Sequence, residues 1–498
     1  MSEPLVVSVD ASTTACKAIA WNATGHTVAE GRAPLALENP APGAWEQDAR
    51  DWWSATTKAL RSVTAAVASG RVAALCIANQ RETFVLTDAA GEPLAPARVW
   101  MDSRGAQSVA DAISTVGAER LHELSGKPPC ITPSLYKLLE LLRQEPALCT
   151  PGTRFCDVHA FLAWKLTDRF ATSLAAADPT GLIDMQARCV SPELLRLTGL
   201  DEGAMPAMVE PGRELGKLTP EAASATGLSP GLPVIAGAGD GQAAGLGAGI
   251  VAPGAAYLNL GTAVVSGVLS SEYVTSRAFR TLHGAAPGSY FLETDLKGGT
   301  FTLTWLVERL LRHKGEVGKV LSELEQEAES IPAGSDGLTL VPYWNGVMNP
   351  FWDDGARGIT IGWHGGHGPA HLYRAVLEGI AFEQRLHTSG VESAIGRSIP
   401  EMIVMGGGST SELWCRILAD VLQKPIVRTG SSEATSLGAA VLAARAAGWF
   451  RTLTEAASAM TRTGARFEPR DPARYDRLYR EVYEPLYPAV RQLIQPLH

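Results

Sequence analysis

The sequence has few cysteines, no long hydrophobic run and no excess of positive charge. Its seven cysteines are scattered over 498 residues, without a Cys-x-x-Cys pair or a Cys/His zinc spacing. This scatter is typical of a reducing compartment and predicts no disulfide framework. No stretch approaches the roughly 18 apolar residues of a membrane span, and the first ten residues lack the pattern of a signal peptide. We therefore expect a soluble cytoplasmic protein without a membrane partner.

The balance of charges argues against another class of partner. With 43 Lys and Arg against 52 Asp and Glu, the net charge is −9, so a nucleic-acid protein held by a general basic surface is not expected. Hydrophobic residues make up 46% of the chain, and a chain of this size buries about three quarters of its extended surface. A disordered protein is thereby excluded, and the length predicts two or three domains.

Several catalytic motifs are also missing. The chain contains no GxxxxGK[ST] phosphate loop and no protein-kinase glycine loop with its HRD and DFG partners. Three histidines, His364, His367 and His371, cluster in a run rich in Gly and Pro. We interpret this run as a surface loop leading into a helix rather than as a metal site.

Two similar patterns of short strands begin the two halves of the chain. Apolar runs at 5–9, 16–21 and 27–30 are separated by polar turns, which predicts an antiparallel meander. A second meander is expected at 256–260, 263–270 and 290–294. Aligning Asp10 with Asn259 places Ser12 on Gly261 and Thr13 on Thr262, 249 residues later. Such a repeat indicates two similar domains rather than a solenoid, and we expect them at 1–247 and 248–498.

Other elements follow from periodicity. Asp48 can cap a helix over 48–67, and strands are expected at 72–78 and 83–87. The middle of the chain, about 108–197, is mostly helical in pattern. A helix at 370–386 precedes a strand at 402–405, a glycine turn and another helix, and the last 50 residues are expected to form terminal helices.

Three loops have residues suited to phosphate chemistry, and each also has a simpler structural explanation. Asp10, two hydroxyls and Lys17 surround a tight turn that either binds phosphate oxygens and a metal through water or is an Asx or Ser/Thr turn. Asp240 is a lone carboxylate among glycines, which either caps backbone or takes a proton. Glycines 406–408 before a helix admit a nucleotide or allow close strand–helix packing. Together with the loop at 258–267, which repeats the first one, these loops fit transfer of a phosphate to a hydroxyl.

Six segments in order resemble the FGGY family of carbohydrate kinases, which includes glycerol kinase and xylulokinase. They are GAWEQDARDWW, NQRETFVLTDAAGEPLAPARVW, GAGDGQAAGLGAG, NPFWDDGARGITIGW, GGGSTSELWCRILADVL and EATSLGAAVLAA. The resemblance extends over residues 5–450. It implies an α/β fold of two actin-like (ribonuclease H-like) domains with ATP, Mg²⁺ and a small sugar or polyol in the cleft between them.

The resemblance also implies roles for individual residues. Asp240 matches the general base, and Asp10 lies near the magnesium. The positions that match the substrate pocket are Gln80, Arg81, Glu82 and Trp100, together with Asp240. The positions that match the ATP site are Thr13, Thr14, Lys17, Gly261, Thr262, Gly298, Gly299, Gly407, Gly408 and Ser411.

Four departures from the family pattern matter, one in the first phosphate loop and three in the acceptor pocket. Ser12 replaces a usual Gly of the first phosphate loop, where it either crowds the γ-phosphate or adds a hydroxyl donor. Gly241 lacks the amide that glycerol kinases and xylulokinases carry as Gln and Asn. Thr132 stands near the place of a Tyr that contacts glycerol, and the pair Arg81-Glu82 replaces the Met-His of xylulokinases. The missing bulk predicts more room than glycerol needs.

We therefore expect ATP-dependent phosphorylation of a primary hydroxyl of a ketopentose such as xylulose or ribulose, or of a four-carbon polyol. Glycerol is the alternative acceptor, because the NQRE signature favours glycerol or a related short polyol. A non-catalytic, nucleotide-binding regulatory protein of the actin-like superfamily is an alternative from another class. The sequence leaves open whether the chain forms a homodimer.

Overall fold

Six strands form a mixed β-sheet in the first half of the chain, in the order β13-β14-β5-β1-β2-β3. The computed structural model describes residues 3–494. Strands β1, β2 and β3 are an antiparallel meander, as expected, and β5 and β14 run parallel to β1. The strands are β1 (Leu5–Ala11), β2 (Ala15–Trp21), β3 (Thr27–Pro34), β5 (Val72–Asn79), β13 (Glu214–Lys217) and β14 (Pro233–Gly239).

Seven strands form the sheet of the second half, in the order β17-β18-β16-β15-β21-β22-β23. Here β15, β16 and β18 are the antiparallel meander, and β21 and β22 run parallel to β15. The strands are β15 (Ala256–Leu260), β16 (Val264–Ser270), β17 (Arg280–His283), β18 (Tyr290–Leu296), β21 (Met402–Met405), β22 (Ile426–Thr429) and β23 (Thr463–Phe467). The five central strands repeat the order and directions of β14-β5-β1-β2-β3, so the internal repeat extends to the topology of the sheets.

The first hairpins of the two sheets differ by one residue. Ala11 pairs with Cys16, which leaves four residues in the first turn. Leu260 pairs with Val264, which leaves three residues in the second. The alignment of Asp10 with Asn259 therefore holds up to the turn, and the second turn is tighter.

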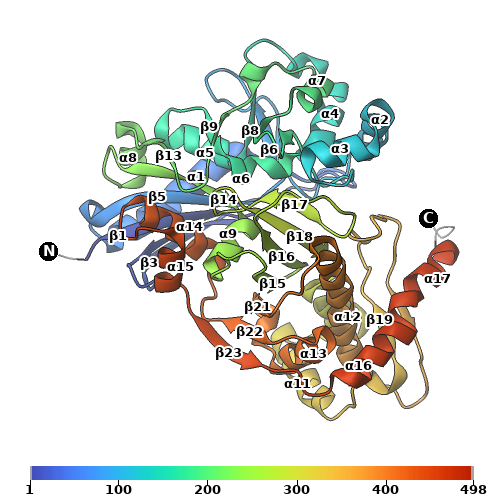
Figure 1. Cartoon of the computed structure of the whole chain (residues 1–498). Coiled ribbons are helices and arrows are strands. Elements are labelled where there is room, and N and C mark those ends of the chain that lie inside the picture. Colours follow the sequence, from blue (N-terminus) through green and yellow to red (C-terminus); the bar gives the residue numbers. More distant parts are fainter. Residues whose placement is uncertain (1–2, 495–498) are drawn as a thin grey trace.

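Helices cover both sheets (Figure 1). Helix α1 begins after Asp48, whose side chain accepts a hydrogen bond from the backbone N–H of Arg50, and it buries Trp52 and Leu60. The longest helix, α12, packs in the core of the second sheet. The helices include α1 (Ala49–Ala66), α2 (Ala106–Val116), α3 (Ala118–Ser125), α4 (Ser134–Gln144), α5 (Val158–Thr167), α6 (Leu174–Ala177), α7 (Pro192–Thr198), α8 (Pro220–Thr226), α9 (Asp240–Gly247), α10 (Thr300–Trp305), α11 (Val317–Glu329), α12 (Pro369–Ile395), α13 (Glu412–Leu422), α14 (Ala434–Ala446), α15 (Leu453–Met460), α16 (Pro472–Leu478) and α17 (Glu484–Ile494).

Two helices from the end of the chain pack against the first sheet. In Figure 1, α14 lies beside β1 and β5, far along the chain from these strands, and α15 packs against α14. Leu437 and Val441 of α14 share one buried cluster with Val6, Ile19 and Cys76. The two halves of the chain therefore share part of their hydrophobic core.

The structure differs from the sequence-based expectations in the connecting regions. The middle of the chain contains α2 to α7, but short strands interrupt it, among them β8 (Arg154–Asp157) and β9 (Ala171–Ser173). Strand β8 joins β6 (Phe84–Thr87) in a separate four-stranded sheet with β4 (Glu46–Gln47) and β7 (Ala97–Arg98). The last 50 residues contain strand β23 as well as helices, and residues 495–498 lie outside the described part.

The histidine run forms the loop that was expected. Residues 363–368 precede α12 without regular structure. In the part of the chain that the structure describes, no group of three His, Cys, Asp or Glu side chains is placed to hold a metal ion. Among residues 3–494, no helix is both long and apolar enough to cross a membrane.

Candidate active site

The ends of three parallel strands bring the predicted residues of the first half together. In the register of the first sheet, Ala11, Asn79 and Gly239 lie side by side at the carboxyl ends of β1, β5 and β14. Asp10 is the second-to-last residue of β1, residues 80–82 follow β5, and Asp240 follows β14. The carboxyl edge of parallel strands is where ligands bind in open α/β sheets.

Asp240 is the first residue of α9. Its Oδ1 atom accepts hydrogen bonds from the N–H of Gly241 at 2.7 Å and pairs with Nε of Arg81 at 2.9 Å. The side chain remains 43% exposed. Desolvation by the surrounding protein raises the pKa of this carboxyl above its ordinary value. The positive charge of Arg81 opposes this rise in pKa, and the negative charge of Glu82 adds to it. Asp240 is thus an accessible carboxylate whose proton affinity is increased.

Arg81 lies across the backbone on both sides of Asp240. A Cβ atom at Gly239 would lie 2.5 Å from Cδ of Arg81, and one at Gly241 would lie 3.1 Å from its Nη2 atom. The Cβ at Gly241 would also lie 2.9 Å from Oε2 of Glu293, which accepts a hydrogen bond from Nη1 of Arg81 at 2.7 Å. The expectation of free room at Gly241 is therefore wrong at this position, because the Arg81–Glu293 ion pair fills the space.

The ion pair of Arg81 continues into a buried network. Arg280 donates from Nη1 to Oε1 of Glu82 at 2.7 Å and from Nε to Oε1 of Glu293 at 2.8 Å. Glu82 has a φ of 53°, a left-handed conformation that is uncommon for a residue with a side chain. Arg280 on β17 and Glu293 on β18 were missed in the sequence. A Glu in the apolar strand YFLETDL was the available signal, because a buried charge in a strand needs a partner.

A second charged group lies beside Asp10. Oδ1 of Asp10 is buried without a hydrogen-bond partner among the described residues. The pKa of Asp10 is raised to about 7, mainly by burial and also by the negative charges of Asp240 and Glu433, while the positive charge of Lys17 acts against the rise. Nζ of Lys17 pairs with Oε1 of Glu433 at 2.7 Å, just before α14. Glu433 is a further acidic residue of the site that the sequence analysis did not single out, although it begins the segment EATSLGAAVLAA.

The first predicted phosphate loop contacts the predicted substrate wall. Trp100, which is 42% exposed, donates from Nε1 to the hydroxyl of Thr13 at 2.9 Å. Thr14 is exposed in the same turn. The hydroxyl of Ser12 donates to the carbonyl of Ala15 at 2.8 Å, so its hydrogen is used inside the turn.

Gln80 has a different environment from its neighbours Arg81 and Glu82. It is buried, its Nε2 donates to Oε1 of Gln47 at 2.9 Å, and its Oε1 accepts from the hydroxyl of Thr83 at 3.3 Å. Both ends of this amide have partners inside the protein. The structure therefore brings Arg81, Glu82 and Asp240 together and leaves Gln80 as support behind them.

The predicted ATP residues of the second half also converge. Gly299 lies against the second hairpin turn, because a Cβ there would be 2.7 Å from the carbonyl oxygen of Gly261 and 2.8 Å from that of Thr262. Gly298 is equally close to backbone, 2.2 Å from the carbonyl oxygen of Pro342. Residues 261–262 and 298–299 thus form one surface at the start of α10.

The glycine turn after β21 packs closely at two of its glycines and is open at the third. Gly406 has a φ of 82°, and a Cβ at Gly408 would lie 2.4 Å from the ring of Trp414, so these glycines serve close packing. A Cβ at Gly407 would meet nothing within 4 Å, which leaves backbone open to a ligand. Ser411 caps α13 by accepting from the N–H of Trp414 and donates to Glu325 at 2.6 Å.

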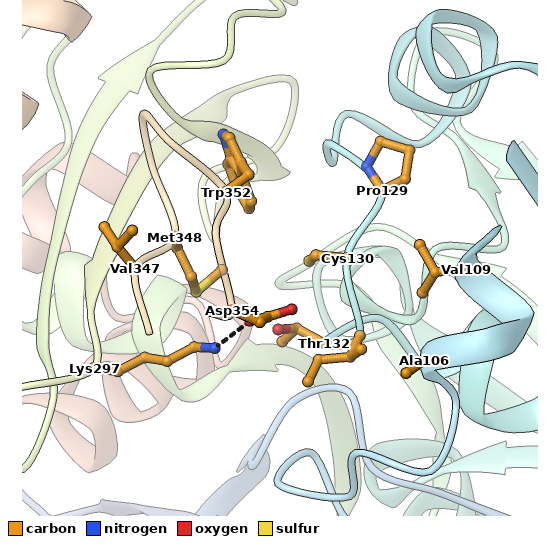
Figure 2. Close-up of a pocket in the computed structure, with 11 residues that line it drawn as sticks. Ala106, Val109, Pro129, Cys130, Thr132, Lys297, Val347, Met348, Trp352 and Asp354 are labelled. Atoms are coloured by element: carbon orange, nitrogen blue, oxygen red, sulfur yellow. Dashed lines mark hydrogen bonds and ion pairs between the residues drawn. The ribbon is translucent and has the colours of Figure 1, made fainter. Parts of the chain in front are cut away.

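A cavity of about 150 Å³ lies between loops of the two halves. Figure 2 shows Cys130 and Thr132 on one side and Met348 and Trp352 on the other. Lys297 and Asp354 form an ion pair of 3.1 Å on the second side. Thr132 is the only one of the discussed substrate positions in the lining, and Lys297 directly precedes the Gly298-Gly299 pair.

Two models of known protein domains together match most of the chain. The model of the N-terminal domain of the FGGY family of carbohydrate kinases matches residues 5–247, and that of the C-terminal domain matches residues 256–447. The chain belongs to the FGGY family of carbohydrate kinases. The fold predicted from the resemblance, α/β with two actin-like domains, is confirmed by solved structures of this family.

Individual FGGY relatives span almost the whole chain. A glycerol kinase of Citrifermentans bemidjiense is 33% identical over 479 residues, covering 93% of this chain and 94% of the relative. A xylulose kinase of Bacillus subtilis is 28% identical over 498 residues, covering 98% and 97%. The crystal structure of a xylulose kinase from Rhodospirillum rubrum, 31% identical, superposes with a TM-score of 0.89 over 98% of this chain and 99% of that one.

This FGGY protein is therefore an ATP-dependent carbohydrate kinase, as predicted. The acceptor is a small sugar or polyol, and ATP is the phosphate donor. The regulatory alternative without turnover is not supported. Relatives with two different acceptors match about equally well, so membership of the family leaves the acceptor to be argued from the site.

Proposed function

We propose that this kinase transfers the γ-phosphate of ATP to a primary hydroxyl of a ketopentose such as xylulose or ribulose, or of a four-carbon polyol, with Asp240 as the general base. The observation that carries the proposal is the position of Asp240. It is an accessible carboxylate with a raised pKa, fixed by Arg81 at the end of the first sheet. A higher pKa makes a carboxylate a stronger acceptor for the proton of the attacking hydroxyl.

The acceptor would be oriented by Arg81. Its Nε and Nη1 atoms bind Asp240 and Glu293, and in this proposal Nη2 binds the acceptor. A hydroxyl oxygen that accepts from Nη2 lies next to the carboxylate of Asp240, which then takes the hydroxyl proton as the oxygen attacks phosphorus. Positioning and charge stabilisation of this kind dominate phosphoryl transfer.

The nucleotide would lie between the two hairpin turns. Lys17 and the hydroxyl of Thr13 on one side, and the backbone of Gly261 and Thr262 on the other, bind phosphate oxygens in this proposal. The open backbone at Gly407 receives the adenosine. Gly408 and Ser411 shape that surface from behind, since both are already used in packing and capping.

Mg²⁺ fits the first turn. The unpartnered oxygen of Asp10 lies among the negative charges of Asp240 and Glu433, a surrounding that a divalent cation stabilises. Mg²⁺ usually keeps waters and phosphate oxygens and takes one or two carboxylates, so Asp10 would hold it through water. When bound, the ion neutralises charge on the phosphates.

In this proposal the room for an acceptor longer than glycerol is the cavity beside Thr132, whose lining includes none of Arg81, Glu82 and Asp240. The space at Gly241 is filled, but Thr132 opens onto the cavity of about 150 Å³ between the two halves. The distal carbons and hydroxyls of a four- or five-carbon acceptor would extend there.

A homodimer and a cytoplasmic location stay predictions.

The test is a comparison of acceptors with MgATP. We expect kcat/KM for xylulose, ribulose or erythritol to exceed that for glycerol. In a matched variant, Thr132→Tyr should narrow the cavity and impair the larger acceptors more than glycerol. Glycerol winning by tenfold, about 1.4 kcal/mol, would contradict the proposed acceptor class while leaving the kinase assignment intact.

A further inference from the structure

Glu293 is the point where the two halves of the chain meet beside the proposed base. It lies on β18 of the second sheet and is fully buried. Its Oε2 atom accepts from Nη1 of Arg81 at 2.7 Å and from the hydroxyl of Tyr257 at 3.4 Å, and its Oε1 atom accepts from Nε of Arg280 at 2.8 Å. Burial alone would raise the pKa of Glu293, but the charges of Arg81 and Arg280 hold it below its ordinary value, so this carboxyl is ionised.

Arg280 extends the same connection to Glu82. Its guanidinium binds Glu82 at 2.7 Å and Glu293 at 2.6 Å, and all three side chains are at most 5% exposed. The partners are 198 and 212 residues apart in the chain for the pairs Arg280–Glu82 and Arg81–Glu293. A buried charge is tolerated only when it is paired and hydrogen-bonded, so these contacts restrict where Arg81 and Glu82 can lie.

Strand β17 is itself fixed to the first half. The N–H of His283 donates to Oδ2 of Asp178 at 2.9 Å, and the N–H of Thr281 donates to the carbonyl of Gly126 at 2.8 Å. Arg280 is therefore presented from a strand that both halves hold. Such a strand gives the network a rigid base.

Gly241 is the local feature that makes this arrangement possible. Any side chain at 241 would begin 2.9 Å from Oε2 of Glu293 and 3.1 Å from Nη2 of Arg81. A Cβ atom essentially never lies 2.9 Å from another heavy atom, so a side chain at 241 would displace the carboxylate of Glu293 and press on the guanidinium of Arg81. The Arg81–Glu293 pair can therefore occupy this position because residue 241 has no side chain.

We propose that Glu293 and Arg280 are positioning residues for the acceptor site: they hold Arg81 and Glu82 from the second half of the chain, and the Arg81–Glu293 pair takes the place of the amide side chain missing at Gly241. The inference rests on the proposed role of Asp240, because Arg81 is the link between that carboxylate and Glu293. Neither Glu293 nor Arg280 touches the acceptor. They act by fixing the guanidinium that does.

The first test is Glu293→Gln, which keeps the shape and removes the charge. Arg81 should lose its anchor, and kcat/KM for the acceptor should fall about 10- to 100-fold, the effect of misplacing a reacting group by about 1 Å. KM for MgATP should stay within about twofold, because the nucleotide residues are elsewhere. A merely structural role would instead reduce the amount of folded enzyme and leave both KM values unchanged.

The matched control is Glu383→Gln. Glu383 is also fully buried in the second half, where it accepts from the hydroxyls of Tyr343 and Tyr483. This variant should lower the melting temperature and leave the acceptor kinetics of the folded fraction unchanged. Equal acceptor defects in the two variants would overturn the inference.

A second variant guards against misfolding. Gly241→Ala should displace the Arg81–Glu293 pair from the other side while suiting the helix, so we expect a shift in melting temperature of at most about 4 °C with an acceptor-specific loss in kcat/KM. In the double variant the two losses should combine to less than their product, since they act on one pair. Full additivity, or wild-type acceptor kinetics in either single variant, would overturn the inference.

The outcome for Asp240→Asn separates this inference from the proposed function. If that variant is inactive and Glu293→Gln is normal, the base stands and the positioning role fails. If Asp240→Asn remains fully active, the base assignment fails first.

Discussion

At the scale of single residues, Asp240 combines a structural and a chemical position. It begins α9, where the helix dipole stabilises a negative charge, and it accepts a hydrogen bond from the N–H of Gly241. It is also accessible and touches Arg81. A capping role and a catalytic role therefore predict different effects for the same substitution.

For Asp240→Asn we expect kcat to fall by about 10² to 10⁴ or more, because the amide cannot take a proton. The melting temperature should change little, since the amide oxygen still accepts from Gly241. Turnover and thermal unfolding measured on one sample decide between the roles. A loss of about 1 kcal/mol in stability with activity kept is the result expected of a cap alone.

Ser12 shows how a residue with two sequence explanations is resolved by its contacts. Its hydroxyl donates to Ala15 within the turn, so it is not a free donor toward a phosphate. The sequence could place Ser12 in the loop but could not tell which way its hydroxyl turns, because that depends on a local hydrogen bond.

At the scale of elements, α9 and α14 are packed backbone to backbone. A Cβ at Gly438 would lie 1.9 Å from the carbonyl oxygen of Ala243, and one at Gly247 would lie 1.9 Å from that of Ala434. Each helix has a glycine where the other passes. Since α9 begins with Asp240, this contact also sets the position of the base.

Gly438→Ala should force the two helices apart. We expect a loss of about 1 to 3 kcal/mol in unfolding free energy, the usual cost of overpacking, and a fall in kcat because the start of α9 moves. The matched control is Gly318→Ala in α11, where a Cβ meets nothing within 4 Å and stability should rise by up to about 1 kcal/mol. Both are measured by denaturant unfolding. Equal stability of the two variants would show that the helices adapt.

The elements that the sequence predicted best are those with local signals. The meanders of β1 to β3 and of β15, β16 and β18 have alternating apolar runs and polar turns, and Asp48 marks the start of α1. Strand β17 was missed because its sequence, RTLH, contains two basic residues and no alternation. It is a strand because it pairs with β18 and because Arg280 binds Glu82 and Glu293. These contacts involve residues distant in the sequence, so no local pattern predicts them.

At the scale of the whole molecule, the candidate-site residues that lie in family motifs could be predicted from the sequence. Those that depend on contacts between the two halves could not. Asp10, Arg81, Glu82 and Asp240 were singled out as candidates because they lie in segments that resemble motifs of the family. The network through Arg280 and Glu293 was not, since its partners are about 200 residues apart in the chain. The packing of α14 on the first sheet is hidden for the same reason.

That packing has a consequence for the expected domains at 1–247 and 248–498. The cluster that contains Val6, Ile19 and Cys76 is completed by Leu437 and Val441 of α14 and by Ala456 of α15. A chain ending at residue 247 would expose this face of its sheet. Uncovering each buried large apolar side chain costs about 1.5 to 3 kcal/mol, and several of them together equal the whole stability of a typical domain, about 5 to 15 kcal/mol.

We therefore expect residues 1–247 expressed alone to show no cooperative thermal transition and to bind a dye for exposed hydrophobic surface. Joining residues 434–460 to that chain through a flexible linker should restore a cooperative transition, because α14 and α15 then cover the sheet. The full chain should unfold in one calorimetric transition, since the two halves share this core. A cooperative transition for residues 1–247 without α14 would show instead that the first half folds on its own and that the shared cluster serves only to hold the halves together.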